Sequence, residues 1–175
     1  MKHSVISIFA VLLLSASIQA SELSLVAGGA ALENLTVQDS VTLFKHPTLF
    51  GVRYEKDFLM LLGLENNLVV SRNMLSPRDS SGEQALYYTA NLVLNFPVDR
   101  IVPNFAVGLG ALYRFGNERP DVGASFLTNW GAGVKFRNLI GPLGARIDYR
   151  RIGIRGVEHQ TITEQEITGG LLFSF

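Results

Sequence analysis

Apolar residues alternate with small or polar residues along most of this chain, and this period of two constrains the fold more than any other feature. In residues 104–115 the odd positions are all apolar or aromatic, and the even positions are mostly small or polar. Residues 129–137 and 143–150 repeat the pattern. Because successive side chains of a β-strand point to opposite faces, the alternation predicts strands with one apolar face. The seventeen glycines and the short apolar runs also disfavour a helical bundle.

Eight such segments follow residue 20, and the connectors between them are alternately long and short. The long connectors are 32–47, 72–84, 116–126 and 155–163, and the short ones lie around Asp57, at 97–102 and at 138–142. In an up-and-down meander, this order puts all long connectors at one end and all tight turns at the other. The predicted strands are 22–31, 48–56, 58–71, 85–96, 103–115, 127–137, 143–154 and 164–175.

These strands are long enough to cross a bilayer. Cleavage after Ala20 would leave 155 of the 175 residues, which is about 19 for each strand with its connector, whereas a tilted transmembrane strand needs about 9–11. The longest apolar run after residue 20, at 58–64, is far too short for a membrane helix. We therefore predict an all-β fold, an eight-stranded antiparallel up-and-down transmembrane β-barrel.

The outward-facing aromatic residues sort into two belts in this arrangement. Aromatic rings prefer the two interfaces between membrane and water, and paired aromatic girdles are typical of transmembrane barrels. The belt near the long connectors contains Phe50, Tyr88, Tyr113 and Trp130, and the belt near the tight turns contains Tyr54, Phe96, Phe105, Phe136 and Phe173.

The opposite phase of the strands supplies the barrel interior, and it carries charges of both signs. An eight-stranded barrel has an interior that side chains can fill, and unpaired buried charges are costly, so we expect a network of ion pairs and no water-filled pore. In the third strand Asn66 falls in the lipid-facing phase, which is a misfit of this arrangement. A β-bulge near Asn66 and Asn67 would turn it inward, but the sequence shows no sign of one. The predicted interior charges are Arg53, Glu65, Arg114, Lys135, Arg146, Asp148, Arg150 and Glu166.

Composition excludes several classes of function. The net charge is zero, so the basic surface that nucleic-acid binding requires is missing. The chain has no cysteine, which excludes disulfides, thiolate metal sites and cysteine nucleophiles. His46 and His159 could approach each other in the long connectors, but two imidazoles are weak evidence for a metal site. We predict no cofactor and no metal.

The first twenty residues have the pattern of a secretory signal peptide. Lys2 and His3 precede an apolar run at 5–14, and the following polar stretch ends with Ala20. The apolar run is too short to span a bilayer as a helix. The predicted organisation is a signal peptide at 1–20 and one barrel domain at 21–175.

The end of the chain, Thr168-Gly-Gly-Leu-Leu-Phe-Ser-Phe175, resembles the last strand of Gram-negative outer-membrane barrels. The stretches 131–135 and 144–150 are similar to the last hairpins of the small eight-stranded barrels of that superfamily. The resemblance covers all of 21–175 in layout and about the last 75 residues in motif. It implies a location in the cell outer membrane and a terminal Phe175 that the barrel assembly machinery reads.

A distant resemblance to the lipid A deacylase branch raises the question of catalysis. That branch carries a His-x-Ser motif on its penultimate strand, where this chain reads Asp148-Tyr149-Arg150-Arg151. Without a base and a hydroxyl nucleophile, the activated-serine mechanism is not available at this position. A substitute triad of His159, Thr161 and Glu164 would lie in a predicted connector, which is a poor geometry for catalysis.

We predict a monomeric, non-enzymatic outer-membrane protein that stabilises the envelope or presents its loops to a surface or partner. The alternatives are a lipid A-modifying hydrolase and a narrow channel for small solutes. The expected partners are outer-membrane lipid and lipopolysaccharide, whose phosphates arginine binds well. The candidate connector arginines are Arg72, Arg78, Arg119 and Arg155.

Overall fold

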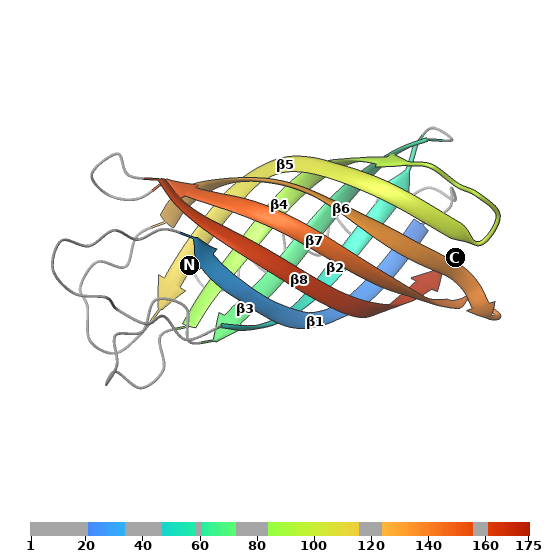
Figure 1. Ribbon diagram of the computed structural model, residues 1–175, viewed down its shortest axis with the longest axis horizontal. Coiled ribbons are helices and arrows are strands. Elements are labelled where there is room, and N and C mark those ends of the chain that lie inside the picture. Colours follow the sequence, from blue (N-terminus) through green and yellow to red (C-terminus); the bar gives the residue numbers. More distant parts are fainter. Residues whose placement is uncertain (1–20, 34–46, 59–60, 73–83, 116–123, 156–160) are drawn as a thin grey trace, which may run out of the picture.

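The computed structural model describes residues 21–33, 47–58, 61–72, 84–115, 124–155 and 161–175. They form eight strands that close into one antiparallel barrel in which every strand pairs with its neighbours in sequence and β1 pairs with β8 (Figure 1). The predicted fold class is therefore confirmed. The strands are β1 (Ser21–Glu33), β2 (Thr48–Asp57), β3 (Leu62–Arg72), β4 (Gln84–Asn95), β5 (Ile101–Phe115), β6 (Ala124–Ile140), β7 (Leu143–Arg155) and β8 (Thr161–Ser174).

The strands wind around the barrel axis with a large stagger. Following the paired residues once around the barrel from Leu32 on β1 leads back to Glu22 on the same strand, ten residues away. A stagger of this size goes with strands tilted by roughly 35–45° to the barrel axis. Figure 1 shows the strands running obliquely around the barrel. The two faces of the wall keep their identity because the pleat continues through each pair of strands.

The two ends of the barrel differ in the connectors that they carry. At the long-connector end the chain passes from β1 to β2, from β3 to β4, from β5 to β6 and from β7 to β8. The short-connector end carries the three tight turns, and there Ser21 and Phe175 exchange backbone hydrogen bonds of 2.9 and 3.0 Å. These two bonds join the start of β1 to the residue that follows β8 and help to close the barrel.

Strand boundaries differ from the predicted ones by a few residues. Asp57, predicted as a turn residue, is the last residue of β2. Phe58, predicted to begin the third strand, lies before β3, and its N–H donates to the Leu62 carbonyl at 3.0 Å. β6 is longer at both ends than predicted and runs into an irregular turn, where the register with β7 shifts between Phe136 and Ile140. Positive φ angles at Asn138 (54°) and Gly141 (60°) make that turn.

β3 has no bulge near Asn66 and Asn67, so the outward position of Asn66 stands. β3 pairs with both neighbours without a register shift. Asn66 faces outward and is half-buried, and its side-chain oxygen accepts a hydrogen bond of 2.5 Å from the Tyr88 hydroxyl. A local hydrogen bond therefore satisfies the polar group on the outer wall, so no bulge is needed to turn it inward.

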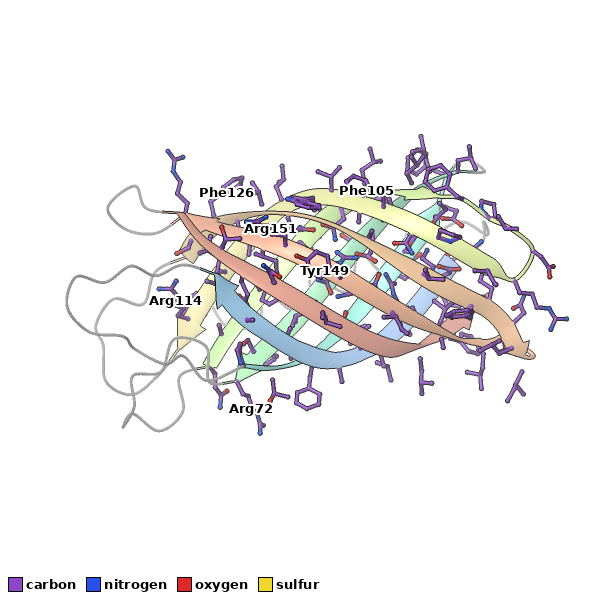
Figure 2. The ribbon with its side chains drawn as sticks, viewed as in Figure 1. Arg72, Phe105, Arg114, Phe126, Tyr149 and Arg151 are labelled. Atoms are coloured by element: carbon purple, nitrogen blue, oxygen red, sulfur yellow. The ribbon has the colours of Figure 1, made fainter. Side chains whose placement is uncertain are left out.

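The outside of the barrel is apolar. Val107, Leu109, Ile147 and Leu171 are 49%, 57%, 59% and 67% exposed, and aromatic side chains project from the same face (Figure 2). Within the described residues, no helix is long and apolar enough to cross a membrane. The predicted signal peptide lies outside the described residues, so the division at residue 20 remains a prediction.

Candidate functional site: the charged interior of the barrel

Alternation along β2 and β7 turns charged side chains toward the barrel axis. Arg53 and Glu55 on β2, and Arg146, Asp148 and Arg150 on β7, are each at most 2% exposed. The residues between them face outward, as the pleat requires. These side chains form two groups of ion pairs at different levels along the axis.

The larger group, which we name the central cluster, brings four strands together, β2, β3, β7 and β8, with Asp148 at its centre. Its carboxylate accepts hydrogen bonds from Arg53 Nη1 at 2.7 Å and from Arg146 Nε at 2.7 Å. A second Arg146 nitrogen, Nη2, donates to the other Asp148 oxygen at 2.8 Å. The cluster consists of Arg53, Glu65, Arg146, Asp148, Arg150 and Glu166.

Glu65 and Glu166 neutralise the remaining guanidinium charge in the central cluster. Glu65 accepts from Arg146 Nη2 at 3.0 Å and from Arg150 Nη2 at 2.7 Å. Glu166 pairs with Arg53 Nη2 at 2.8 Å. With three arginines and three carboxylates, the cluster has no net charge. Neutral polar side chains add further hydrogen bonds to the cluster, namely Ser24, Asn67, Asn91 and Thr168.

The second group, the short-connector cluster, lies near the tight turns. Lys135 Nζ, which is fully buried, donates to Glu22 at 2.9 Å, to Glu55 at 2.7 Å and to Asn95 at 3.1 Å. Arg137 pairs with Glu22 and, at 3.1 Å, with Asp57. In both clusters each charge is held by a charge of opposite sign, and among the described residues the only buried polar atom of the two clusters that lacks a hydrogen-bond partner is Arg150 Nη1.

The interior near the long-connector end is mainly apolar, and this layer was not among the features that the sequence interpretation identified. Leucine and isoleucine side chains close this level of the barrel because they occupy inward positions of the same alternation. The apolar layer consists of Ala30, Leu49, Val69, Ala85, Tyr87, Leu112, Leu127, Ile152 and Ile154.

Two polar groups meet this apolar layer. The Tyr87 hydroxyl donates to the second oxygen of Glu166, which links the layer to the central cluster. Glu164 is fully buried, and neither of its carboxylate oxygens has a hydrogen-bond partner among the residues that the structure describes.

Seven of the eight predicted interior charges lie in the two clusters, and Arg114 is the exception. Arg114 is half-buried and lies two residues beyond Leu112 of the apolar layer, at the rim of the long-connector end (Figure 2). The alternation correctly predicted that the Arg114 side chain lies on the inner face of the wall. Its level along the axis depends on the stagger of the whole barrel, which the sequence does not display.

The nine predicted girdle residues all face outward. Six of them are exposed and three, Tyr54, Tyr88 and Phe136, are half-buried. The placement of the two aromatic belts at the two membrane–water interfaces remains a prediction. Phe126 and Tyr149 are further outward aromatic residues that the belts omitted, although both lie in the outward phase of their strands. The exposed members are Phe50, Phe96, Phe105, Tyr113, Trp130 and Phe173.

The sequence interpretation missed Glu22, Asp57, Arg137 and Glu164 as interior charges. It considered Glu164 only as part of a triad in a predicted connector, whereas the structure has this side chain fully buried on β8. Glu22 stands in the same phase as Ser24 and Val26, so the signal was present at the start of β1. Asp57 and Arg137 were assigned to turns or strand ends. No sequence pattern indicated a role for Tyr87, because its hydrogen bond to Glu166 joins residues 79 apart in the chain.

The site has no arrangement typical of hydrolysis on β7. Asp148 and Arg150 point inward and are held in ion pairs, while Tyr149 and Arg151 occupy the outward phase. His46 and His159 lie outside the described residues. Within the described parts of the chain, no group of three histidine or acidic side chains is arranged to hold a metal ion.

Several solved structures share this fold. Neisserial surface protein A superposes with a TM-score of 0.69 at 13% identity, covering 90% of this chain and all of that one. OprG from Pseudomonas aeruginosa gives 0.61 at 10% identity, with 89% of this chain and 95% of that chain covered. The outer membrane enzyme PagL gives 0.57 at 17% identity, with coverages of 87% and 98%.

No protein-family model matches the chain, and no curated protein matches it in sequence. At 10–17% identity the structural likeness concerns the fold. The chain is an all-β, eight-stranded closed antiparallel barrel of the kind found in small outer-membrane proteins. One of these neighbours is an enzyme, so the fold by itself is compatible with more than one function.

Proposed function

We propose that this protein is a monomeric, non-enzymatic barrel of the cell outer membrane, which stabilises the envelope or presents its long connectors to a surface or partner. The observation that carries the proposal is the contrast between the two faces of the wall. Apolar side chains cover the outside, while the inside holds two clusters of paired charges, an apolar layer and the buried carboxylate of Glu164. A bilayer favours this distribution because hydrocarbon solvates the outside and the closed sheet satisfies its backbone groups.

The closed interior supports a role other than conduction. The central cluster fills the barrel with ion pairs of 2.7–3.0 Å, and the apolar layer covers it toward the long-connector end. A solute would have to separate Arg53 from Asp148 or Glu65 from Arg150. Breaking such buried pairs is strongly unfavourable.

Heat modifiability on a gel tests whether the protein folds as a barrel in detergent. Conductance in planar bilayers tests whether it acts as a channel. We expect the detergent-folded protein to migrate differently on a gel before and after boiling, because a closed barrel resists the detergent in the gel. In planar bilayers it should give no reproducible single-channel steps, while a general porin in the same chamber does. Equal gel mobilities would contradict the barrel in detergent, and steady unitary currents would favour the channel.

Hydrolysis of a lipid is the second candidate function, because the sequence distantly resembles the lipid A deacylase branch and one structural neighbour, PagL, is an outer membrane enzyme. Against it stands the sequence of β7, where Asp148 and Arg150 are engaged in ion pairs and no histidine or serine is present. Mass spectrometry of lipid A from cells that express the protein decides between the two. An unchanged lipid A mass supports the non-enzymatic function. Loss of an acyl chain that depends on Asp148 would establish the enzyme.

A further inference from the structure

A polar patch interrupts the apolar outer wall on β6, β7 and β8 near the long-connector end. Trp130 on β6 pairs with Arg151 on β7, and Arg151 pairs with Gln165 on β8. The next outward row of the wall contains Thr128, Gly153 and Thr163. We name the following residues the outer-wall patch: Thr128, Trp130, Arg151, Arg155, Thr163 and Gln165.

Apolar residues surround this patch. On one side Trp130 pairs with Val107 of β5, which is 49% exposed, and on the other side Gln165 pairs with Ala31 of β1, which is also exposed. The row toward the short-connector end contains Tyr149 and Ile167, which are 36% and 62% exposed. Polar groups therefore reach into a part of the wall that is otherwise apolar.

The charge of the patch has one sign. Arg151 is half-buried against the wall, and Arg155 is exposed four residues further along the same face of β7, about 13 Å away at the strand rise. Among the described outward-facing residues of β6, β7 and β8, there is no aspartate or glutamate. Figure 2 labels Arg151 and Tyr149 along β7, with Arg151 nearer the long-connector end.

The neighbours of Arg151 locate it relative to a bilayer. A guanidinium group on the lipid-facing wall is unfavourable in hydrocarbon and well tolerated at the level of the headgroups. Tryptophan prefers the same interface, and Trp130 stands directly beside Arg151. The first polar row of the patch thus marks the headgroup level on this side of the barrel.

We propose that the outer-wall patch binds a phosphate group of lipopolysaccharide in the outer leaflet. Arginine matches phosphate with two parallel hydrogen bonds. The amide of Gln165, the β8 partner of Arg151, and the hydroxyl of Thr128, one outward row further along β6, are additional donors. Trp130 offers an apolar ring to the adjoining sugar or acyl chain. The inference rests on the proposed location in the outer membrane, and it adds the residues and the ligand chemistry.

Trp130 is the only tryptophan of the chain, so its fluorescence reports on the patch without labelling. The experiment first establishes a heat-dependent gel shift for each detergent-folded sample. Bisphosphorylated lipid A is then titrated into the folded protein. We expect a saturable change in emission. Dephosphorylated lipid A and phosphatidylglycerol should bind at least about tenfold more weakly, because the first lacks phosphate and the second lacks the sugar.

The variant Arg151→Gln should weaken the binding of lipid A about tenfold or more, and Arg155→Gln should weaken it less. The matched control is Arg100→Gln, which removes an exposed arginine at the short-connector end and should bind like the wild type. Wild-type affinity in Arg151→Gln, or equal binding of the dephosphorylated lipid, would overturn the inference. Loss of the gel shift in the wild type would instead contradict the proposed membrane barrel.

Discussion

Asp148 illustrates how the interior charges depend on one another. It faces two guanidinium groups, Arg53 at 2.7 Å and Arg146 at 2.7 Å, in a region from which water is nearly absent. Burial of a charge is compensated only when its partners and hydrogen bonds are in place. Removing one carboxylate therefore leaves an excess of buried positive charge on both arginines.

We predict that Asp148→Asn lowers the free energy of unfolding by about 3–5 kcal/mol, because it breaks a buried ion-pair network while keeping the volume of the side chain. Urea unfolding of the protein in phospholipid vesicles measures the change. Asp99→Asn is the matched control, since Asp99 is exposed in a tight turn with a φ of 57° that asparagine also adopts. It should alter stability by no more than about 0.5 kcal/mol.

A difference of less than 1 kcal/mol between Asp148→Asn and Asp99→Asn would show that water enters the central cluster and screens its charges. That outcome would also weaken the argument against conduction, because a hydrated interior is the condition for a channel.

At the level of the strands, close approach of backbones limits which residues the wall accepts. Gly131 on β6 faces the interior, and a Cβ atom there would collide with the carbonyl oxygen of Tyr149 on β7. Gly169 on β8 faces outward, and the nearest atom to a Cβ there would be the Arg146 carbonyl oxygen at 3.9 Å, an ordinary contact. The two glycines thus serve different purposes in strands of the same sheet.

Gly131→Ala should destabilise the barrel by about 1–3 kcal/mol, because the added methyl group forces β6 and β7 apart. Gly169→Ala should leave the free energy of unfolding unchanged within about 0.5 kcal/mol. Both values come from the same urea titration. Equal effects of the two substitutions would mean that strand separation is not the limiting factor at Gly131.

The apolar side chains of the barrel face its surroundings. Placing an arginine at a central and at a peripheral position of the outer wall tests whether those surroundings are lipid. Val107 lies midway along β5 and is 49% exposed, whereas Ile101 begins the same strand and is 47% exposed. In a bilayer Val107→Arg should cost about 2–4 kcal/mol and Ile101→Arg about 0–1 kcal/mol, because the penalty depends on depth. Unfolding in vesicles gives both values. In a barrel surrounded by water, both changes would be nearly neutral.

Assembly of the barrel in the cell is a property of the whole chain, and Phe175 is its predicted signal. Its ring lies 5.8 Å from that of Phe173, and the side chain is 63% exposed. Phe175→Ala should reduce the amount of heat-modifiable protein in outer membranes several-fold, while the purified, refolded variant keeps its stability within about 1 kcal/mol. The control is Phe58→Ala, another exposed aromatic residue at the short-connector end. Equal yields of both variants would contradict an assembly role for Phe175.

The sequence by itself determined the eight strands, their antiparallel order and the face on which each side chain lies. These features are local: the pleat sends neighbouring residues to opposite faces, so Leu109 and Arg146 reveal their sides of the wall without any knowledge of their partners. The same local rule identified seven of the interior charges and missed four others within four residues of a strand end, namely Glu22, Asp57, Arg137 and Glu164.

Only the tertiary structure decided which groups meet. Arg53 pairs with Asp148, 95 residues away, and Lys135 with Glu22, 113 residues away, and these partners follow from the stagger of the closed barrel. That stagger is set when β1 joins β8, and it also places the apolar layer above the central cluster and Arg114 at the rim. The alternation is a property of each strand, whereas levels along the axis belong to the closed circuit of all eight, because each pairing register shifts every later strand along the axis.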